Sequence, residues 1–349
     1  MSVNEDKGPP GFVPASLEKL TQVTRLSDTI YAADLASELC VGSVPNGGYV
    51  ASVILRVAQE YLAPRDQRDT MHTHIQYLSR TQAGPAYLVV EEAKMGRNTS
   101  VLHISVHQQG LLATAPFLDG GGSDAAAAPK GRKARVTAYV TNTNLAKQSG
   151  ITLPTSWKLP DAPAPVDLGL LSCGQDRAWT RIQVPLMRRI PSVKTLDFFA
   201  QRAGHVSNAA HDYWVRCANG EPFTSVSLGF VADAAAAMIP ESYRQEDAGR
   251  PPRDGEIRHD QAYWYPTVTL SIDVKKKLPE PEEGEGGARW LRLRAASKAI
   301  RNGRSDLEIV IFDQGGELVA LSHHVAMVLD FSRNLSGRRQ SSPAARGKM

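Results

Sequence analysis

The chain of 349 residues is 42% hydrophobic and carries a formal net charge of +4. It is long enough for two domains of ordinary size, and its small charge has no accompanying basic-aromatic motif, which argues against a nucleic-acid partner. Three widely spaced cysteines, Cys40, Cys173 and Cys217, argue against a disulfide framework and against a cysteine zinc site.

No apolar signal segment or membrane-spanning run is visible in the sequence, so we expect a soluble cytoplasmic protein without a membrane partner. The terminal Gly-Lys-Met resembles a peroxisomal address only loosely, which makes that location the less favoured one. A glycine-rich phosphate loop, a dinucleotide fingerprint and a Gly-x-Ser-x-Gly elbow are also missing, and no histidine has companions at metal-ligand spacing. The sequence therefore predicts neither a cofactor nor a metal.

The first half of the chain reads as one helix followed by strands. We expect residues 1–26 to be flexible and a short strand around 29–31. The Pro45–Gly48 turn precedes a largely apolar helix from Tyr49 to Leu62. Strand-like segments bounded by Gly, Pro or Asn predict strands at 74–80, 86–94, 100–108 and 111–117, and another strand is expected at 135–143. The alanine- and glycine-rich stretch 119–134 indicates a flexible insertion.

The second half repeats this order after a proline-spotted linker, residues 151–170. Its central feature is LGFVADAAAAMI, residues 228–239, which predicts one long buried helix ended by Pro240. Strands are expected at 193–200, 212–218, 265–275, 290–298, 307–313 and 317–329. Residues 333–349 read as a disordered basic tail.

Together the halves form an internal repeat of a buried helix followed by antiparallel strands. We therefore predict an α+β double hotdog, in which two antiparallel sheets each wrap around a long helix. The N-terminal hotdog covers residues 27–150 and the C-terminal hotdog covers residues 171–332.

Asp233 is the only ionisable residue in the apolar run 228–239. Burying a lone carboxylate is costly unless it is paired or used, so Asp233 is a candidate general base; the alternative is an aspartate satisfied by backbone donors or an arginine. Gly47 and Gly48 begin the first helix, where their N–H groups could stabilise an oxyanion, or simply form a tight turn.

Two strands supply the other candidate site residues. Thr267 and Thr269 fall on one face of an alternating strand, which could equally be a solvated sheet face. His323 and His324 are adjacent and must point to opposite faces. His324 shares its row with Ser322 and Ala326, small side chains that leave room for a substrate, although a core histidine remains the alternative.

Four ordered segments carry a family resemblance: PNGGYVASVILR, SLGFVAD, the Tyr263–Thr267 pentapeptide YWYPT, and GELVALSHHVAMVLD. The chain resembles the acyl-CoA thioesterase II-type, thioesterase-like superfamily, and its fungal branch in particular. The resemblance implies a double hotdog in which Asp, Thr and Gln activate a water molecule. These positions fall on Asp233, Thr267 and His324, so the chain departs from the family at the third.

The resemblance therefore implies an acyl-thioester hydrolase with Asp233, Thr267 and His324 as catalytic residues. Gly47, Gly48, Thr269 and His323 are expected to contact the substrate, either acyl-CoA or a carrier-bound acyl thioester. A non-catalytic acyl-binding or scaffold protein on the same fold remains the alternative. A hydratase is less favoured because no histidine follows Asp233 closely. Sheet-edge pairing between copies would permit homo-oligomers.

Overall fold

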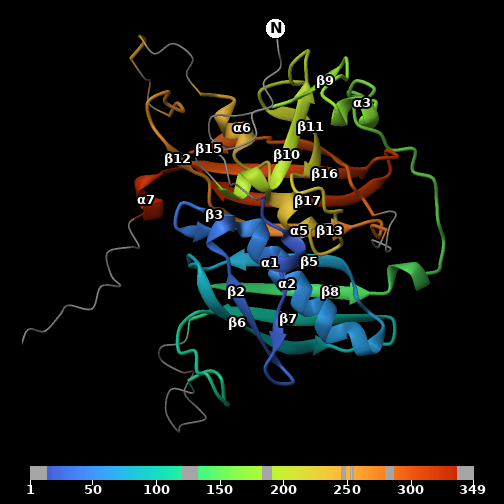
Figure 1. The fold of residues 1–349 in the computed structure, drawn as a ribbon, viewed down its shortest axis with the longest axis vertical. Helices are drawn as coiled ribbons and strands as arrows, with labels where there is room; N and C mark the ends of the chain where they lie inside the picture. Colours follow the sequence, from blue (N-terminus) through green and yellow to red (C-terminus); the bar gives the residue numbers. More distant parts are fainter. Residues whose placement is uncertain are drawn as a thin grey trace, which may run out of the picture.

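The computed structural model describes residues 14–119, 133–182, 191–244, 249–251, 253, 255–279 and 287–335. Within these residues the dominant feature is a 14-stranded antiparallel sheet. In Figure 1 the N-terminal half, blue to green, lies below the C-terminal half, yellow to red, and helix α2 (Gly47–Leu62) crosses in front of the lower strands.

The N-terminal strands, in spatial order, are β1 (Thr24–Arg25), β2 (Ile30–Leu35), β6 (Gly84–Lys94), β7 (Thr99–His107), β8 (Val136–Thr143) and β5 (Asp69–Tyr77). The C-terminal strands follow as β13 (Thr267–Val274), β17 (Leu318–Met327), β16 (Arg304–Asp313), β14 (Leu291–Ala296), β11 (Ala210–Cys217), β10 (Leu196–Gln201) and β9 (Trp179–Arg181), with β15 (Ile300–Arg301) paired to β16. Two small ribbons pair β3 (Cys40–Val41) with β4 (Val44–Pro45) and β12 (Tyr263–Trp264) with β18 (Leu329–Asp330).

The prediction of two separate sheets is wrong, because β5 and β13 join the halves. These strands pair antiparallel from Gln76 opposite Thr269 to His72 opposite Asp273. An unpaired strand edge exposes a row of backbone N–H and C=O groups. Here β5, at the edge of the N-terminal strands, and β13, at the edge of the C-terminal strands, hydrogen-bond to each other, so neither edge is left open. The α+β class and the antiparallel pairing of the expected strands are confirmed.

A second correction concerns residues 228–239, which do not form one long helix. α5 ends after six residues (Leu228–Asp233), and α6 (Met238–Glu241) starts after a turn and contains Pro240. Between them the N–H of Ala234 donates to the Val231 carbonyl, and the N–H of Ala236 donates to the Asp233 carbonyl. Both bonds span three residues, whereas an α-helical bond spans four. Helix propensity is a weak preference that tertiary contacts override, and here the small alanines line a cavity.

The expected strand at 111–117 is also absent. Only an isolated bridge joins Leu111 to Leu118. The place beside β7 is taken by β8, which pairs with it from Thr99 opposite Thr143 to Val106 opposite Val136. Most of the expected insertion, residues 120–132, lies outside the described residues, as do residues 1–13 and 336–349 of the two expected flexible ends.

The described parts of those two ends pack against the body. α1 (Leu17–Leu20) follows Ser16, and the Leu17 side chain is only 2% exposed. The N–H of Leu17 and the Ser16 hydroxyl both donate to Glu221. At the other end α7 (Ser332–Leu335) holds a buried Asn334 that bonds to Ser43 and Val41. The linker keeps its irregular course until α3 (Leu168–Ser172).

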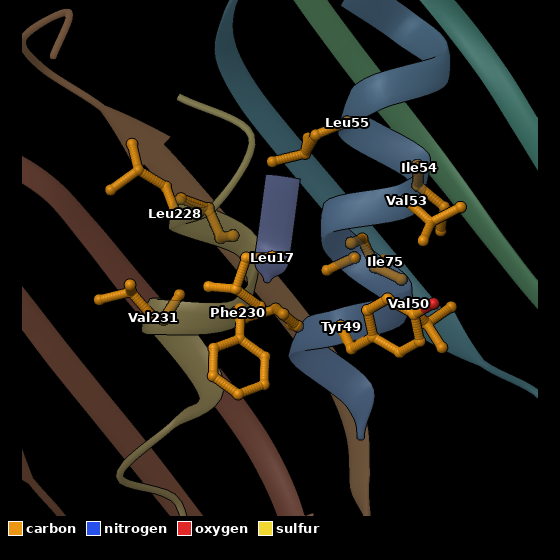
Figure 2. Packing of buried hydrophobic residues seen from close by; sticks show 14 of the residues in the cluster. Leu17, Tyr49, Val50, Val53, Ile54, Leu55, Ile75, Leu228, Phe230 and Val231 are labelled. Atoms are coloured by element: carbon orange, nitrogen blue, oxygen red, sulfur yellow. The ribbon is translucent and has the colours of Figure 1, made fainter. Parts of the chain in front are cut away.

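Helices α2 and α5 pack directly on each other in the core. Figure 2 shows α2 side chains such as Tyr49 and Val53 gathered with Phe230 and Val231 of α5 in one apolar cluster. A Cβ on Gly229 would lie 2.6 Å from the Ser52 nitrogen, and one on Gly48 would lie 2.7 Å from the Gly229 oxygen. Glycine at these two positions therefore allows the backbones to approach, and the N–H of Phe230 donates to the Ser52 hydroxyl at 2.9 Å.

Candidate active site

Asp233 is the last residue of α5, and its side chain is held at the start of α2. The N–H of Gly48 donates to Asp233 Oδ2 at 2.9 Å, and the Thr267 hydroxyl donates to Oδ1 at 2.8 Å. His324 Nδ1 lies 3.5 Å from the same Oδ1. The structure therefore brings together the three predicted catalytic residues from α5, β13 and β17.

Burial determines the acidity of this carboxyl group. Desolvation raises the pKa of Asp233 from 3.8 to about 6, although hydrogen bonds from Thr267, Gly48 and Asn46 oppose the shift. A carboxylate with this pKa is mostly ionised at neutral pH and is a better proton acceptor than a solvated one. Asp233 thus has the protonation behaviour that a general base near neutral pH requires.

Thr267 reaches Asp233 because strand β13 is irregular at its start. The pairing of β13 with β17 shifts between Thr267 and Thr269. This bulge breaks the two-residue alternation, so Thr267 faces the core helices while Ser271 and Asp273 face the outside of the sheet. The prediction that Thr267 and Thr269 lie on one face of the strand is therefore wrong at Thr267.

The His324 side chain lies next to Asp233 inside the core. Its side chain is 0% exposed, and its Nε2 lies 2.8 Å from the Ser322 hydroxyl oxygen. Burial, reinforced by His323, lowers the pKa of His324 to about 3, against an opposing backbone hydrogen bond at Ala232. The ring is therefore neutral at physiological pH.

A cavity of about 260 Å³ opens beside the Asp233 carboxylate. Asp233, Thr267 and Gly47 line it, together with the small side chains of Ala234, Ala236 and Ala237. The remaining wall consists of Val41, Val44, Pro45, Asn46, Tyr77, Ser79, Arg80, Thr81, Tyr263, Trp264, Tyr265, Pro266 and Val268. Most of this lining is apolar, and Asp233 takes part in it beside Thr267 and the first turn of α2.

Tyr77, Asn46 and the aromatic wall were not among the predicted site residues. The Tyr77 hydroxyl donates to the Gly47 carbonyl at 2.6 Å, and burial beside Asp233 raises its pKa. Asn46 caps α2 by accepting from the N–H of Tyr49 at 3.0 Å. An asparagine directly before an apolar helix is a common N-cap, so the capping role of Asn46 could have been predicted from the sequence. The Arg80 guanidinium lies 4.9 Å from the centre of the Trp264 ring, and no sequence pattern linked these two residues.

Not every expected substrate contact lies at this cavity. His323 is exposed on the opposite face of β17 and lines an outer groove of about 710 Å³ with Trp157, Ser271 and Asp273. Thr269 is not in the lining of the Asp233 cavity. The Gly48 N–H is occupied by Asp233, so the oxyanion role expected for it would fall to Gly47, whose N–H has no intrahelical partner in the first turn.

The described part of the chain has neither a metal-binding cluster nor a helix that could span a membrane. No group of three or more His, Cys, Asp or Glu side chains there could hold a metal ion. No helix among those residues is long and apolar enough to cross a membrane.

An antiparallel sheet around buried helices defines a hotdog protein, and comparison with known proteins agrees. A conserved protein of unknown function with a hot dog fold from Alicyclobacillus acidocaldarius is similar in structure, with a TM-score of 0.63, 15% identity, and coverage of 90% of this chain and 98% of that one. The acyl-CoA thioesterase II TesB2 of Mycobacterium marinum has a TM-score of 0.55 and 18% identity, and the match covers 90% and 97% of the two chains.

Sequence comparison gives the family. Residues 35–118 match the acyl-CoA thioesterase N-terminal domain, and residues 160–328 match the acyl-CoA thioesterase C-terminal domain. The thioesterase-like protein TwmA of Talaromyces wortmannii is 35% identical over 358 residues, which cover 97% of this chain and 99% of the relative. The chain therefore belongs to the acyl-CoA thioesterase family of thioester hydrolases, as the sequence resemblance predicted.

Proposed function

We propose that this protein hydrolyses an acyl thioester by direct attack of water, on a double hotdog made of the two halves. The observation that carries the proposal is the buried Asp233 carboxylate, held by Gly48 and Thr267 at the wall of an apolar cavity. The match of separate N- and C-terminal thioesterase domains to the two halves supports the repeat.

Asp233 is the general base in this mechanism. An ionised carboxylate has about four acceptor positions, of which Gly48, Thr267 and Asn46 use three, so a water in the cavity can donate to the remaining one. Asp233 takes a proton as the water oxygen bonds to the thioester carbonyl carbon. The carbon–sulfur bond then breaks, the proton passes to the thiolate, and a carboxylic acid and a thiol leave.

Thr267 and Gly47 complete the site. Thr267 fixes the carboxylate through a 2.8 Å hydrogen bond and lines the same cavity, so it can also contact the water. Gly47 begins α2, and its N–H at the positive end of the helix would stabilise the negative charge that develops on the carbonyl oxygen. His324 contributes through Asp233, because it does not line the cavity.

The substrate is an acyl-CoA or a carrier-bound acyl thioester. We place the acyl end in the apolar part of the cavity, against the alanines and the Tyr263–Tyr265 wall. At about 260 Å³ the space lies below the usual range for small-molecule sites, which is roughly 300–1,000 Å³. The bulk of a coenzyme or carrier would therefore remain outside it.

The test is release of free thiol from a series of acyl-CoAs by the purified full-length protein. We expect Asp233→Asn to lower kcat/KM by about 10²–10⁴-fold, the usual contribution of a general base. Asp273→Asn is the matched control, because Asp273 lies on the outer groove and pairs with Lys275. Equal thiol release by wild type and Asp233→Asn would reject the mechanism. Tight acyl-CoA binding without turnover would instead support an acyl-thioester-binding protein.

A further inference from the structure

Ser322, His324 and Asp233 form a buried chain of polar groups that ends at the cavity. The Ser322 hydroxyl oxygen lies 2.8 Å from His324 Nε2, and His324 Nδ1 lies 3.5 Å from Asp233 Oδ1. Ser322 is 3% exposed and His324 0%, and neither lines the Asp233 cavity. The order of groups is that of a serine-hydrolase triad, but the serine lies at the end remote from the substrate cavity, so it cannot be the nucleophile there.

The imidazole is neutral in this environment. Burial is the main reason that the pKa of His324 falls to about 3. A neutral ring carries one proton, so one nitrogen donates a hydrogen bond and the other accepts. A ring with so low a proton affinity is a poor base at neutral pH, which leaves hydrogen bonding as its available role.

The neighbours of the ring determine which nitrogen carries the proton. Ionised Asp233 can only accept, so an unprotonated Nδ1 would set a lone pair against Oδ1. Within the described part of the chain Nδ1 makes no hydrogen bond of standard geometry, and the nearby Asp233 carboxylate oxygen lies 3.5 Å away. The Ala232 carbonyl, which interacts with the ring, can also only accept, so both groups favour a proton on the ring nitrogen that faces them. Nε2 must then accept, and the Ser322 hydroxyl, which can donate, lies at the right distance.

We propose that Ser322 is a positioning residue that holds His324 in the Nδ1–H tautomer, and that His324 donates to ionised Asp233 instead of acting as a base. The proposal rests on the hydrolytic role of Asp233 given above. At 3.5 Å the Nδ1 to Oδ1 contact is longer than a standard hydrogen bond. Catalytic hydrogen bonds are often long in the free enzyme and tighten when substrate binds.

The first test needs no activity. In the full-length protein with ¹⁵N-labelled histidine at pH 8, the nitrogen shifts of His324 should show a protonated Nδ1 and an unprotonated Nε2. His324→Gln identifies the signals by their loss. A protonated Nε2 in the wild-type protein at this pH would overturn the proposal. Because the readout is the tautomer, it stands apart from the thiol-release assay on which the proposed function depends.

The second test compares His324→Gln with His324→Leu. Glutamine can donate to Asp233 and accept from Ser322 without titrating, whereas leucine can do neither. We expect His324→Gln to keep kcat/KM within about tenfold of wild type. His324→Leu should lose more than this, and the acidic limb of its pH profile should move upward by about half a pH unit or more, because a donor to the charged form is lost. If glutamine fails as badly as leucine while the variant remains folded, the imidazole itself is the base.

Variants of Ser322 complete the test. Ser322→Ala should shift the acidic limb in the same direction as His324→Leu but by less, and Ser322→Thr, which keeps the hydroxyl, should restore it. Among the described residues, Tyr77 from β5 and His324 from β17 interact with Asp233, and Arg80, Tyr263 and Tyr265 line the same cavity. Tyr77 has its pKa raised by burial, so it does not titrate in this range. An unchanged tautomer and an unchanged limb in Ser322→Ala would remove Ser322 from the proposal.

Discussion

The N–H of Gly48 donates to Asp233 Oδ2 at 2.9 Å across a separation of 185 residues. This bond joins the first turn of α2 to the last residue of α5, so each half of the chain supplies one side of the candidate site. A helix N-terminus favours a negative charge. The contact therefore fixes the carboxylate and stabilises its ionised form at the same time.

The two threonines at the start of β13 should respond differently to substitution. Thr267→Ala removes the hydroxyl that donates to Asp233, so we expect kcat/KM for thioester hydrolysis to fall by tenfold or more. Thr269→Ala lies beyond the bulge and outside the cavity, so its effect should be smaller. Thiol-release kinetics of the two variants provide the comparison. A larger loss in Thr269→Ala would contradict the placement of the bulge.

Asp233 should make the stability of the protein depend on pH. Its pKa is raised from 3.8 to about 6 on folding, so between these values the folded state binds more protons than the unfolded state. Stability is then lost as pH rises through this window, by about 2 kcal/mol between pH 4 and pH 7. Urea unfolding of wild type and Asp233→Asn at both pH values measures the difference. As pH rises, the unfolding free energy of Asp233→Asn should increase relative to that of wild type. An unfolding free-energy difference that stays constant with pH would contradict the buried, ionised carboxylate.

Gly229→Ala should destabilise the contact between the two helices. The added Cβ would lie 2.6 Å from the Ser52 nitrogen and 3.0 Å from the Ala51 carbonyl carbon, and backbone atoms cannot move aside alone. Overpacking of this kind costs about 1–3 kcal/mol, and we expect the upper end of that range. In Gly169→Ala, the control in α3, the nearest atom would be the Asp167 carboxylate at 3.2 Å. Denaturant midpoints that fall equally in both variants would argue against close packing of α2 on α5.

Tyr77→Phe should affect both stability and activity. The hydroxyl donates to the Gly47 carbonyl at 2.6 Å inside the cavity wall, and the substitution removes this second hydrogen bond to the carbonyl. We expect a loss of about 0.5–1.5 kcal/mol in unfolding free energy and a reduced kcat, because Gly47 would be less firmly placed. The matched change is Tyr139→Phe, since Tyr139 is 55% exposed on β8. Thermal unfolding and thiol release should leave Tyr139→Phe near wild type.

The sequence alone determined the class of the fold, most of its strands and the identity of the buried acid. Strand-like segments bounded by turn residues, such as 86–94 and 100–108, predicted strands that the structure forms as β6 and β7, because Gly, Pro and Asn mark where a strand must turn. The single ionisable residue in an apolar run pointed to Asp233, since its burial would be too costly without partners.

Only the tertiary structure decided how these parts meet. The bulge that turns Thr267 toward Asp233 arises from pairing with β17, and the end of α5 after six residues depends on contacts that override the helix preference of alanine. The union of the two halves through β5 and β13 is likewise a contact between distant strands. Local sequence specifies the period and burial of each segment, whereas register, bulges and the groups that surround a buried charge depend on residues that are distant in the sequence.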